Sequence, residues 1–167
     1  MDYLTNSAEE TQKIGEKFAQ EISRGKTAVI ICLKGKLGAG KTTFLQGLAR
    51  GLKIKEKILS PTFVIMNRIG LRGGVCKNFY HFDCYRLEDS KEIIDLGFEE
   101  IISDKNNLVC IEWPEKIAKV LPTEVIEINF EVLEGDKRKI HPHLFKKDGG
   151  KKTKKKWKRK KEKIMFL

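Results

Sequence analysis

The stretch AVIICLKGKLGAGKT, residues 28–42, decides how this chain folds. Its first part, Ala28–Leu33, is an unbroken apolar run rich in β-branched residues, typical of a strand buried on both faces of a parallel sheet. Its second part, Gly35–Thr42, matches the pattern G-x-x-x-x-G-K-[ST] at every fixed position. A helix is predicted from about Lys41 to Gly51. The motif therefore has the strand before it and the helix after it that it requires.

This pattern is that of a phosphate-binding loop. Its glycines let backbone N–H groups curl around phosphate oxygens, and the new helix adds its positive N-terminal end. The Lys41 ammonium suits the β- and γ-phosphates of a nucleotide, and the Thr42 hydroxyl can ligate Mg²⁺. A chance match in a glycine-rich turn is disfavoured by the correct flanks. Expected phosphate contacts are Gly38, Ala39, Gly40, Lys41, Thr42 and Thr43.

The rest of the chain predicts strands and helices around this loop. We expect helices over Ser7–Arg24, from Ser90 and from Pro114, and strands over Thr62–Ile69, Val75–Phe82, Leu108–Ile111 and Val125–Val132. Gly70–Gly74 suggests a hairpin between the first two of these strands. The fold class is therefore α/β. It is a P-loop NTPase-like three-layer sandwich with a mostly parallel central sheet and helices on both faces.

Two carboxylates come where α/β sheets place their sites, at or just past the ends of strands. Asp83 follows Val75–Phe82, and Glu112 follows Leu108–Ile111. Each is a candidate for holding Mg²⁺ or orienting water, and the alternative for each is an ordinary exposed acid. The chain contains no convincing guanine-recognition element of the type [NT]-K-x-D, which favours ATP as the nucleotide.

The length of 167 residues suits one globular domain, and no apolar run is long enough to cross a bilayer. The polar, acidic N-terminus predicts no signal peptide and hence a cytoplasmic protein. The four cysteines form no C-x-x-C pair and are expected to be free thiols. Zinc held by Cys76, His81 and Cys84 is a weak alternative, because a fourth ligand is missing.

The net charge of +11 is concentrated in one segment. Twelve of the 34 basic residues lie within Lys146–Lys163, and the rest of the chain is close to neutral. This composition predicts an ATPase domain over residues 1–144 and a disordered lysine-rich segment over residues 145–167. The segment is either a nucleic-acid arm, whose affinity would fall steeply with salt, or an accidental or frame-shifted terminus that merely stays solvated.

Four segments, in this order and spacing, resemble one family. They are GKLGAGKTTFLQG (35–47), SPTF (60–63), YHFDCYR (80–86) and IEWPE (111–115). Together they are similar to the TsaE family, also called YjeE, of bacterial tRNA threonylcarbamoyladenosine biosynthesis. The resemblance runs from about Ser7 to Ile140. One departure is Lys36, where the family often carries an acid.

The resemblance implies a slow ATPase that uses ATP and Mg²⁺ and works with two partner proteins, TsaB and TsaD. This machinery modifies the adenosine next to the anticodon of tRNAs that read codons beginning with A. The tRNA would be reached through the complex, with the lysine-rich segment as a further candidate contact.

The resemblance also implies roles for individual residues. Lys41, Asp83 and Glu112 would carry catalysis, and Thr42 and Glu112 would hold the metal. Ser60 and Thr62 would lie on a loop near the γ-phosphate. Nucleotide contacts are further implied for Thr11, Trp113 and Arg138. The residues alone equally allow a helix-surface position for Thr11 and core packing for Trp113.

Two other functions remain as alternatives. A small P-loop kinase acting on a metabolite would usually need a mobile, arginine-rich lid, and no such insertion is evident. A non-catalytic RNA-binding module would depend on the lysine-rich segment and ignore Lys41.

Overall fold

The computed structural model describes residues 2–22, 26–58, 64–148 and 151–156 of the chain. Its strands are β1 (Tyr3–Thr5), β2 (Val29–Lys34), β3 (Met66–Gly70), β4 (Asn78–Asp83), β5 (Asn107–Glu112), β6 (Glu124–Val132), β7 (Arg138–Asp148) and β8 (Lys151–Lys156). Its helices are α1 (Ala8–Glu21), α2 (Lys41–Gly51), α3 (Lys91–Ile94), α4 (Phe98–Ser103) and the 3₁₀ helix η1 (Pro114–Ile117). Within these ranges, no helix is both long and apolar enough to cross a membrane.

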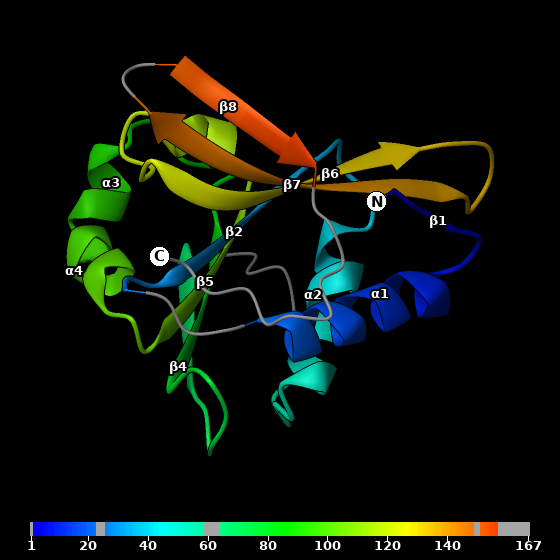
Figure 1. The fold of residues 1–167 in the computed structure, drawn as a ribbon, viewed down its shortest axis with the longest axis horizontal. Coiled ribbons are helices and arrows are strands. Elements are labelled where there is room, and N and C mark those ends of the chain that lie inside the picture. Colours follow the sequence, from blue (N-terminus) through cyan, green and yellow to red (C-terminus); the bar gives the residue numbers. More distant parts are fainter. Residues whose placement is uncertain (1, 23–25, 59–63, 149–150, 157–167) are drawn as a thin grey trace.

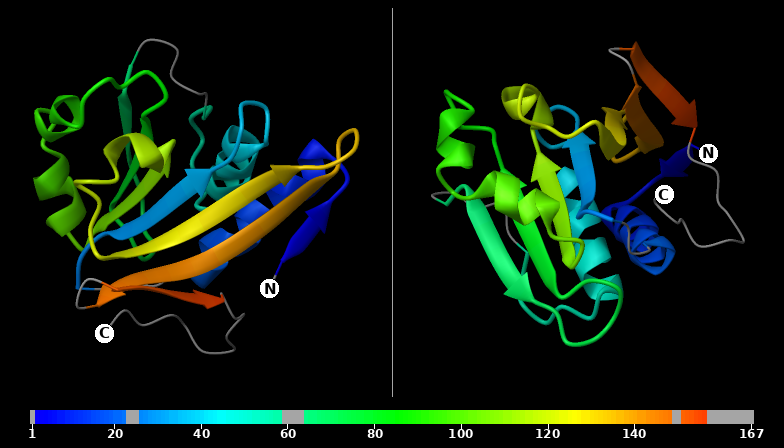
Figure 2. Two further views of the ribbon diagram at one scale, coloured as in Figure 1. Left: turned by 90° about the horizontal axis from the view of Figure 1, so that it is seen from above. Right: turned by 60° about the vertical axis from the view of Figure 1, so that its left-hand side comes forward.

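All the strands join one mixed sheet, in the order β1-β7-β6-β2-β5-β4-β3 (Figure 1). β8 lies outside this order and pairs with β7. The central neighbours β6, β2, β5 and β4 are parallel. The outer pairs are antiparallel, and β6 and β7 form a long twisted ribbon, yellow and orange in Figure 2. The α/β fold with a parallel centre is therefore confirmed.

Helices cover both faces of the sheet (Figures 1 and 2). α1 and α2 pack on one face, where Phe18 and Phe44 meet Ile31 of the central strand. α3, α4 and η1 pack on the other face, where Phe98 meets Ile30 and Phe82. Because neighbouring residues of β2 point to opposite faces, its continuous apolar run serves both cores at once.

α1 begins where the sequence predicts. The Ser7 hydroxyl accepts the backbone N–H of Glu10, which caps the helix. The Glu10 carboxylate accepts the backbone N–H of Asn6. Together these contacts satisfy donors that a helix start leaves unpaired.

α1 and α2 approach so closely that glycine is required between them. A Cβ added at Gly47 of α2 would lie 2.0 Å from the backbone oxygen of Gln12. A Cβ at Gly15 of α1 would lie 2.2 Å from the backbone oxygen of Phe44. This contact joins the helix that carries the phosphate-binding motif to the N-terminal helix.

We expect Gly47→Ala to lower the free energy of unfolding by about 3 kcal/mol, because the added methyl group overpacks a backbone-to-backbone contact. Gly70→Ala is the control, since no atom lies within 4 Å of a Cβ there, and its effect should stay within about 0.5 kcal/mol. Urea unfolding measures both. Equal stability of the two variants would contradict the close helix contact.

Two predicted elements differ from the structure. The helix expected from Ser90 is divided into α3 and α4, because Gly97 adopts φ +76° between them. The predicted hairpin is confirmed, although β3 begins at Met66 and β4 at Asn78, later than the expected strands. Residues 62 and 63 of the first expected strand lie outside the described part of the chain.

The lysine-rich segment also differs from its prediction. β7 continues to Asp148, and β8 pairs with it in an antiparallel register that runs from Asp148↔Lys151 to His143↔Lys156. The prediction of disorder therefore does not hold for residues 145–148 and 151–156. The ladder is made by backbone groups, which a lysine-rich sequence supplies as well as any other, and lysines on an edge strand discourage further pairing.

Candidate functional site

The candidate site lies at the carboxyl ends of three neighbouring parallel strands. Glu112, the last residue of β5, is in register with Leu33 of β2 on one side and with Asp83 of β4 on the other. The phosphate-binding loop leaves β2 at the same edge and leads into α2. This is the edge at which open α/β sheets bind their ligands.

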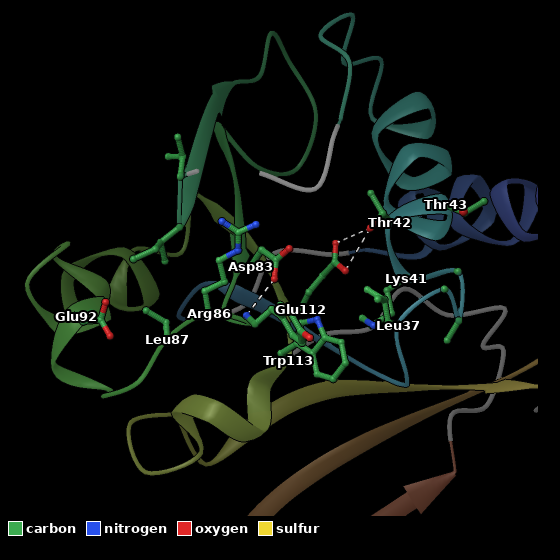
Figure 3. Close-up of a pocket in the computed structure, with 16 residues that line it drawn as sticks. Leu37, Lys41, Thr42, Thr43, Asp83, Arg86, Leu87, Glu92, Glu112 and Trp113 are labelled. Atoms are coloured by element: carbon green, nitrogen blue, oxygen red, sulfur yellow. Dashed lines mark hydrogen bonds between the residues drawn. The ribbon is translucent and has the colours of Figure 1, made fainter. Parts of the chain in front are cut away.

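A cavity of about 670 Å³ opens there (Figure 3). Its volume is in the range of small-molecule and cofactor sites. The residues that line it come from the loop, from α2 and from the segments that follow β4 and β5. They are Leu37–Thr43, Val64, Ile65, Asp83, Tyr85, Arg86, Leu87, Glu92, Glu112 and Trp113.

The loop has the backbone shape that its glycines allow. Gly38 and Gly40 have φ values of +75° and +97°, which side chains with a Cβ rarely adopt. Gly40 is also the N-cap of α2, so the first backbone N–H groups of that helix face the cavity end of the loop. The structure thus places Gly38, Ala39, Gly40 and Thr43, four of the expected phosphate contacts, on the cavity wall.

Lys41 is held inside the loop by the loop itself. Its Nζ donates to the backbone oxygens of Gly35 at 2.8 Å and Lys36 at 3.1 Å. Two of the three ammonium protons are used in this way. Burial lowers the pKa of Lys41, and the nearby carboxylates of Glu112 and Asp83 oppose that shift. The ammonium is therefore fixed at the place where the motif puts phosphate.

Trp113 forms the floor beneath this ammonium. Nζ of Lys41 lies 4.1 Å from the centre of the Trp113 ring, a cation–π contact, and Tyr85 packs on the same ring at 4.9 Å. Trp113 has a left-handed backbone, with φ +59°, which a bulky residue rarely adopts. Such strain persists where the surroundings enforce it, and here it brings the indole ring to the cavity.

Glu112 and Thr42 meet across the cavity. Thr42 Oγ1 donates to Glu112 Oε1 at 3.0 Å and lies 3.3 Å from Oε2, shown as dashed lines in Figure 3. A hydroxyl and a carboxylate are hard oxygen donors of the kind that Mg²⁺ prefers. The described residues contain no cluster of three His, Cys, Asp or Glu side chains able to hold a metal.

Asp83 lines the cavity on the side away from the loop. Its Oδ1 accepts the backbone N–H of Tyr85 at 3.1 Å, which orients the carboxylate. Arg86, three residues further along the chain, also lines the cavity (Figure 3). Beyond the loop and Glu112, the cavity wall therefore carries the carboxylates of Asp83 and Glu92 and the guanidinium of Arg86.

Two predicted nucleotide contacts, Thr11 and Arg138, are not among the residues that line the cavity. Thr11 is buried, and its hydroxyl is engaged by Thr5 and by the backbone oxygen of Ser7. Thr11 instead supports the loop from behind, since its methyl group lies 3.8 Å from where a Cβ of Gly40 would be. Arg138 reaches the loop from β7, with its guanidinium 3.5 Å from the backbone oxygen of Gly38. Ser60 and Thr62 lie outside the described residues.

Sequence reasoning left two features out of the site. Tyr85 and Arg86 follow Asp83 in a turn and reach the cavity. His81 also reaches the site, since its Nε2 lies 3.0 Å from Glu112 Oε1. The sequence could have indicated that His81 lies at the site, because side chains alternate between the two faces of a strand. His81 and Asp83 are two residues apart on β4 and so share one face.

The cysteines do not form a metal site. All four are buried and none forms a disulfide, and burial raises the pKa of the Cys32, Cys84 and Cys110 thiols. His81, the third residue of the weak zinc alternative, contacts Glu112 instead. The expectation of four free thiols is confirmed.

Comparisons with known proteins agree on one family. The family model described as "Threonylcarbamoyl adenosine biosynthesis protein TsaE" matches residues 5–140. A Rickettsia prowazekii protein named tRNA threonylcarbamoyladenosine biosynthesis protein TsaE is 39% identical over 146 residues, covering 86% of this chain and 96% of its own. A Treponema pallidum protein of the same name is 35% identical, covering 84% of this chain and 98% of its own.

A solved structure is similar as well. The crystal structure of the Bacillus subtilis protein YdiB superposes with a TM-score of 0.67 at 31% sequence identity. The alignment covers 84% of this chain and 82% of the YdiB chain. The similarity in fold therefore extends well beyond the phosphate-binding loop.

Proposed function

The chain belongs to the TsaE family of tRNA threonylcarbamoyladenosine biosynthesis proteins, and from this we propose that it is a slow, Mg²⁺-dependent ATPase of that pathway. It acts in the cytoplasm with the partner proteins TsaB and TsaD. The modified base is the adenosine next to the anticodon of tRNAs that read codons beginning with A.

One observation carries the proposal. The hydroxyl of the motif threonine, Thr42, hydrogen-bonds a carboxylate that ends the neighbouring parallel strand, Glu112. This pairing joins a phosphate-binding loop to an acidic strand end, which is the arrangement that holds Mg²⁺ in P-loop NTPases. A glycine-rich turn that matched the motif by chance would have no reason to meet such a carboxylate.

The loop residues bind and orient the nucleotide. The backbone N–H groups around Gly40 and the first turn of α2 donate hydrogen bonds to the phosphate oxygens. Lys41, already held by two loop carbonyls, directs its remaining ammonium proton toward the β- and γ-phosphates. Thr42 and Glu112 would hold Mg²⁺, which would supply positive charge opposite the transferring phosphate.

Asp83 is the residue that we assign to the attacking water. Its carboxylate is oriented by the Tyr85 backbone and faces the cavity from the strand beside Glu112. Phosphoryl transfer depends mainly on positioning and charge. A subunit that lacks part of this constellation until its partners bind would hydrolyse ATP slowly on its own.

The tRNA is reached through the complex with TsaB and TsaD. The lysine-rich segment is a second candidate contact, because twelve basic residues lie within Lys146–Lys163. A phosphate contact of this type would weaken as salt is raised.

The test is ATP hydrolysis by the purified chain, alone and mixed with TsaB and TsaD, with GTP as the comparison nucleotide. We expect a slow basal rate that rises on mixing. A fast rate that ignores the partners would contradict the proposal. Stoichiometric phosphorylation of an added small acceptor would favour a metabolite kinase instead.

A further inference from the structure

A chain of three polar side chains runs from the sheet core into the site. Glu112 Oε1 lies 3.0 Å from Thr42 Oγ1 and 3.0 Å from His81 Nε2. Both the histidine and the glutamate are buried, with 1% and 3% of their surface exposed. Among the described residues, these are the two side chains that hydrogen-bond the Glu112 carboxylate.

The contacts determine which ring nitrogen of His81 carries the proton. The ionised Glu112 carboxylate only accepts hydrogen bonds, so Nε2 must carry the hydrogen for this contact to form. The other ring nitrogen, Nδ1, is buried and has no hydrogen-bond partner. A proton on Nδ1 would be a buried unsatisfied donor, so the neutral Nε2–H tautomer fits both observations.

Packing alone does not account for a histidine at this position. His81 lies on the face of β4 that carries Phe79, which is fully buried in the same layer. An apolar side chain would fill that layer without leaving a ring nitrogen unpaired. The histidine is explained by the one contact that an apolar side chain cannot make, its hydrogen bond to Glu112.

We propose that His81 is a positioning residue that holds the Glu112 carboxylate in place for Mg²⁺; this inference rests on the proposed function. If the Thr42 oxygen turns to the metal, His81 is the donor that remains on Glu112. Water cannot readily replace it, because the pair is buried. Partners of this kind, behind a metal ligand, commonly change metal affinity by about 10- to 100-fold when removed.

The test measures how strongly Mg²⁺ promotes nucleotide binding. The dissociation constant of ADP is determined by calorimetry in EDTA and in saturating Mg²⁺, and their ratio gives the Mg²⁺ coupling. We expect His81→Leu to lower this ratio about 10-fold while leaving the constant in EDTA nearly unchanged. His81→Gln keeps an N–H donor of similar reach and should restore the ratio to within about threefold.

Phe79→Leu is the matched control, since it truncates a buried side chain on the same strand face. It should lower the melting temperature without changing the coupling ratio. A folded His81→Leu protein with wild-type coupling would overturn the inference, and so would equal losses in His81→Leu and His81→Gln. A wild-type protein without any Mg²⁺ coupling would instead refute the metal site of the proposed function.

A second measurement needs no substitution at the site. Nitrogen-15 NMR of the imidazole rings distinguishes the two neutral tautomers in the wild-type chain. The chain has three histidines, and His141→Gln and His143→Gln variants assign the third signal to His81. We expect the Nε2–H tautomer. An Nδ1–H tautomer would remove the hydrogen bond on which the inference depends and would overturn it.

Discussion

Replacing Lys41 with alanine is expected to lower ATP turnover by about 100-fold or more, in the presence of TsaB and TsaD as well as without them. The ammonium is a positive charge that two carbonyls of the loop hold in place, at 2.8 and 3.1 Å. Removing a single fixed group that stabilises transition-state charge typically costs about 10²- to 10³-fold. Steady-state phosphate release measures the effect.

The matched control is Lys36→Ala, in the same loop. The Lys36 side chain is exposed, and only its backbone oxygen contacts Lys41, so turnover should change less than about twofold. Burial lowers the pKa of Lys41, which means that burying its charged ammonium opposes folding. Lys41→Ala should therefore still fold. A folded Lys41→Ala protein with normal turnover would show that the site is assigned wrongly.

Glu112→Gln is expected to reduce Mg²⁺-dependent turnover by about 100-fold. The carboxylate accepts from both Thr42 and His81 and offers a second oxygen toward the cavity. An amide has a single oxygen for those two donors, and its nitrogen repels the metal. If the metal still binds its remaining ligands in Glu112→Gln, a high Mg²⁺ concentration should restore part of the lost turnover.

Glu115→Gln is the control for charge alone. Glu115 is exposed, lies three residues along the chain and also acts on the pKa of Lys41. If turnover falls equally in both variants, the loss comes from removing a negative charge near Lys41 and not from removing a metal ligand. Initial rates across a Mg²⁺ titration separate the two cases.

The phosphate-binding part of the site could be predicted because its information is local. The loop motif, the apolar strand before it and the helix after it lie within residues 28–51. Asp83 and Glu112 were found for a similar reason, since each ends an apolar run. Neighbouring parallel strands then bring the two carboxylates into register, as the structure shows.

The parts that were missed depend on contacts distant in sequence. β1 has only three residues and pairs with residues 138–140, far along the chain, while β7 and β8 are rich in charged residues and are defined by their pairing near the sheet edge. A composition argument cannot detect such pairing. Thr11 was expected at the nucleotide, but its burial behind the loop follows from how α1 packs on α2.

His81 shows the same limit at the site itself. One buried histidine in a strand looks structural until the neighbouring strand is placed beside it. The register of β4 on β5 sets His81 beside Cys110, two residues before Glu112, and so brings Nε2 to the carboxylate.

The most direct measurement is a crystal structure with Mg²⁺ and a non-hydrolysable ATP analogue. The account predicts β- and γ-phosphates inside the loop at residues 38–42, with Lys41 Nζ on them. It predicts Mg²⁺ at Thr42 and Glu112, with His81 still bonded to Glu112. A nucleotide bound elsewhere, or phosphates in the loop with the metal away from Glu112, would contradict it.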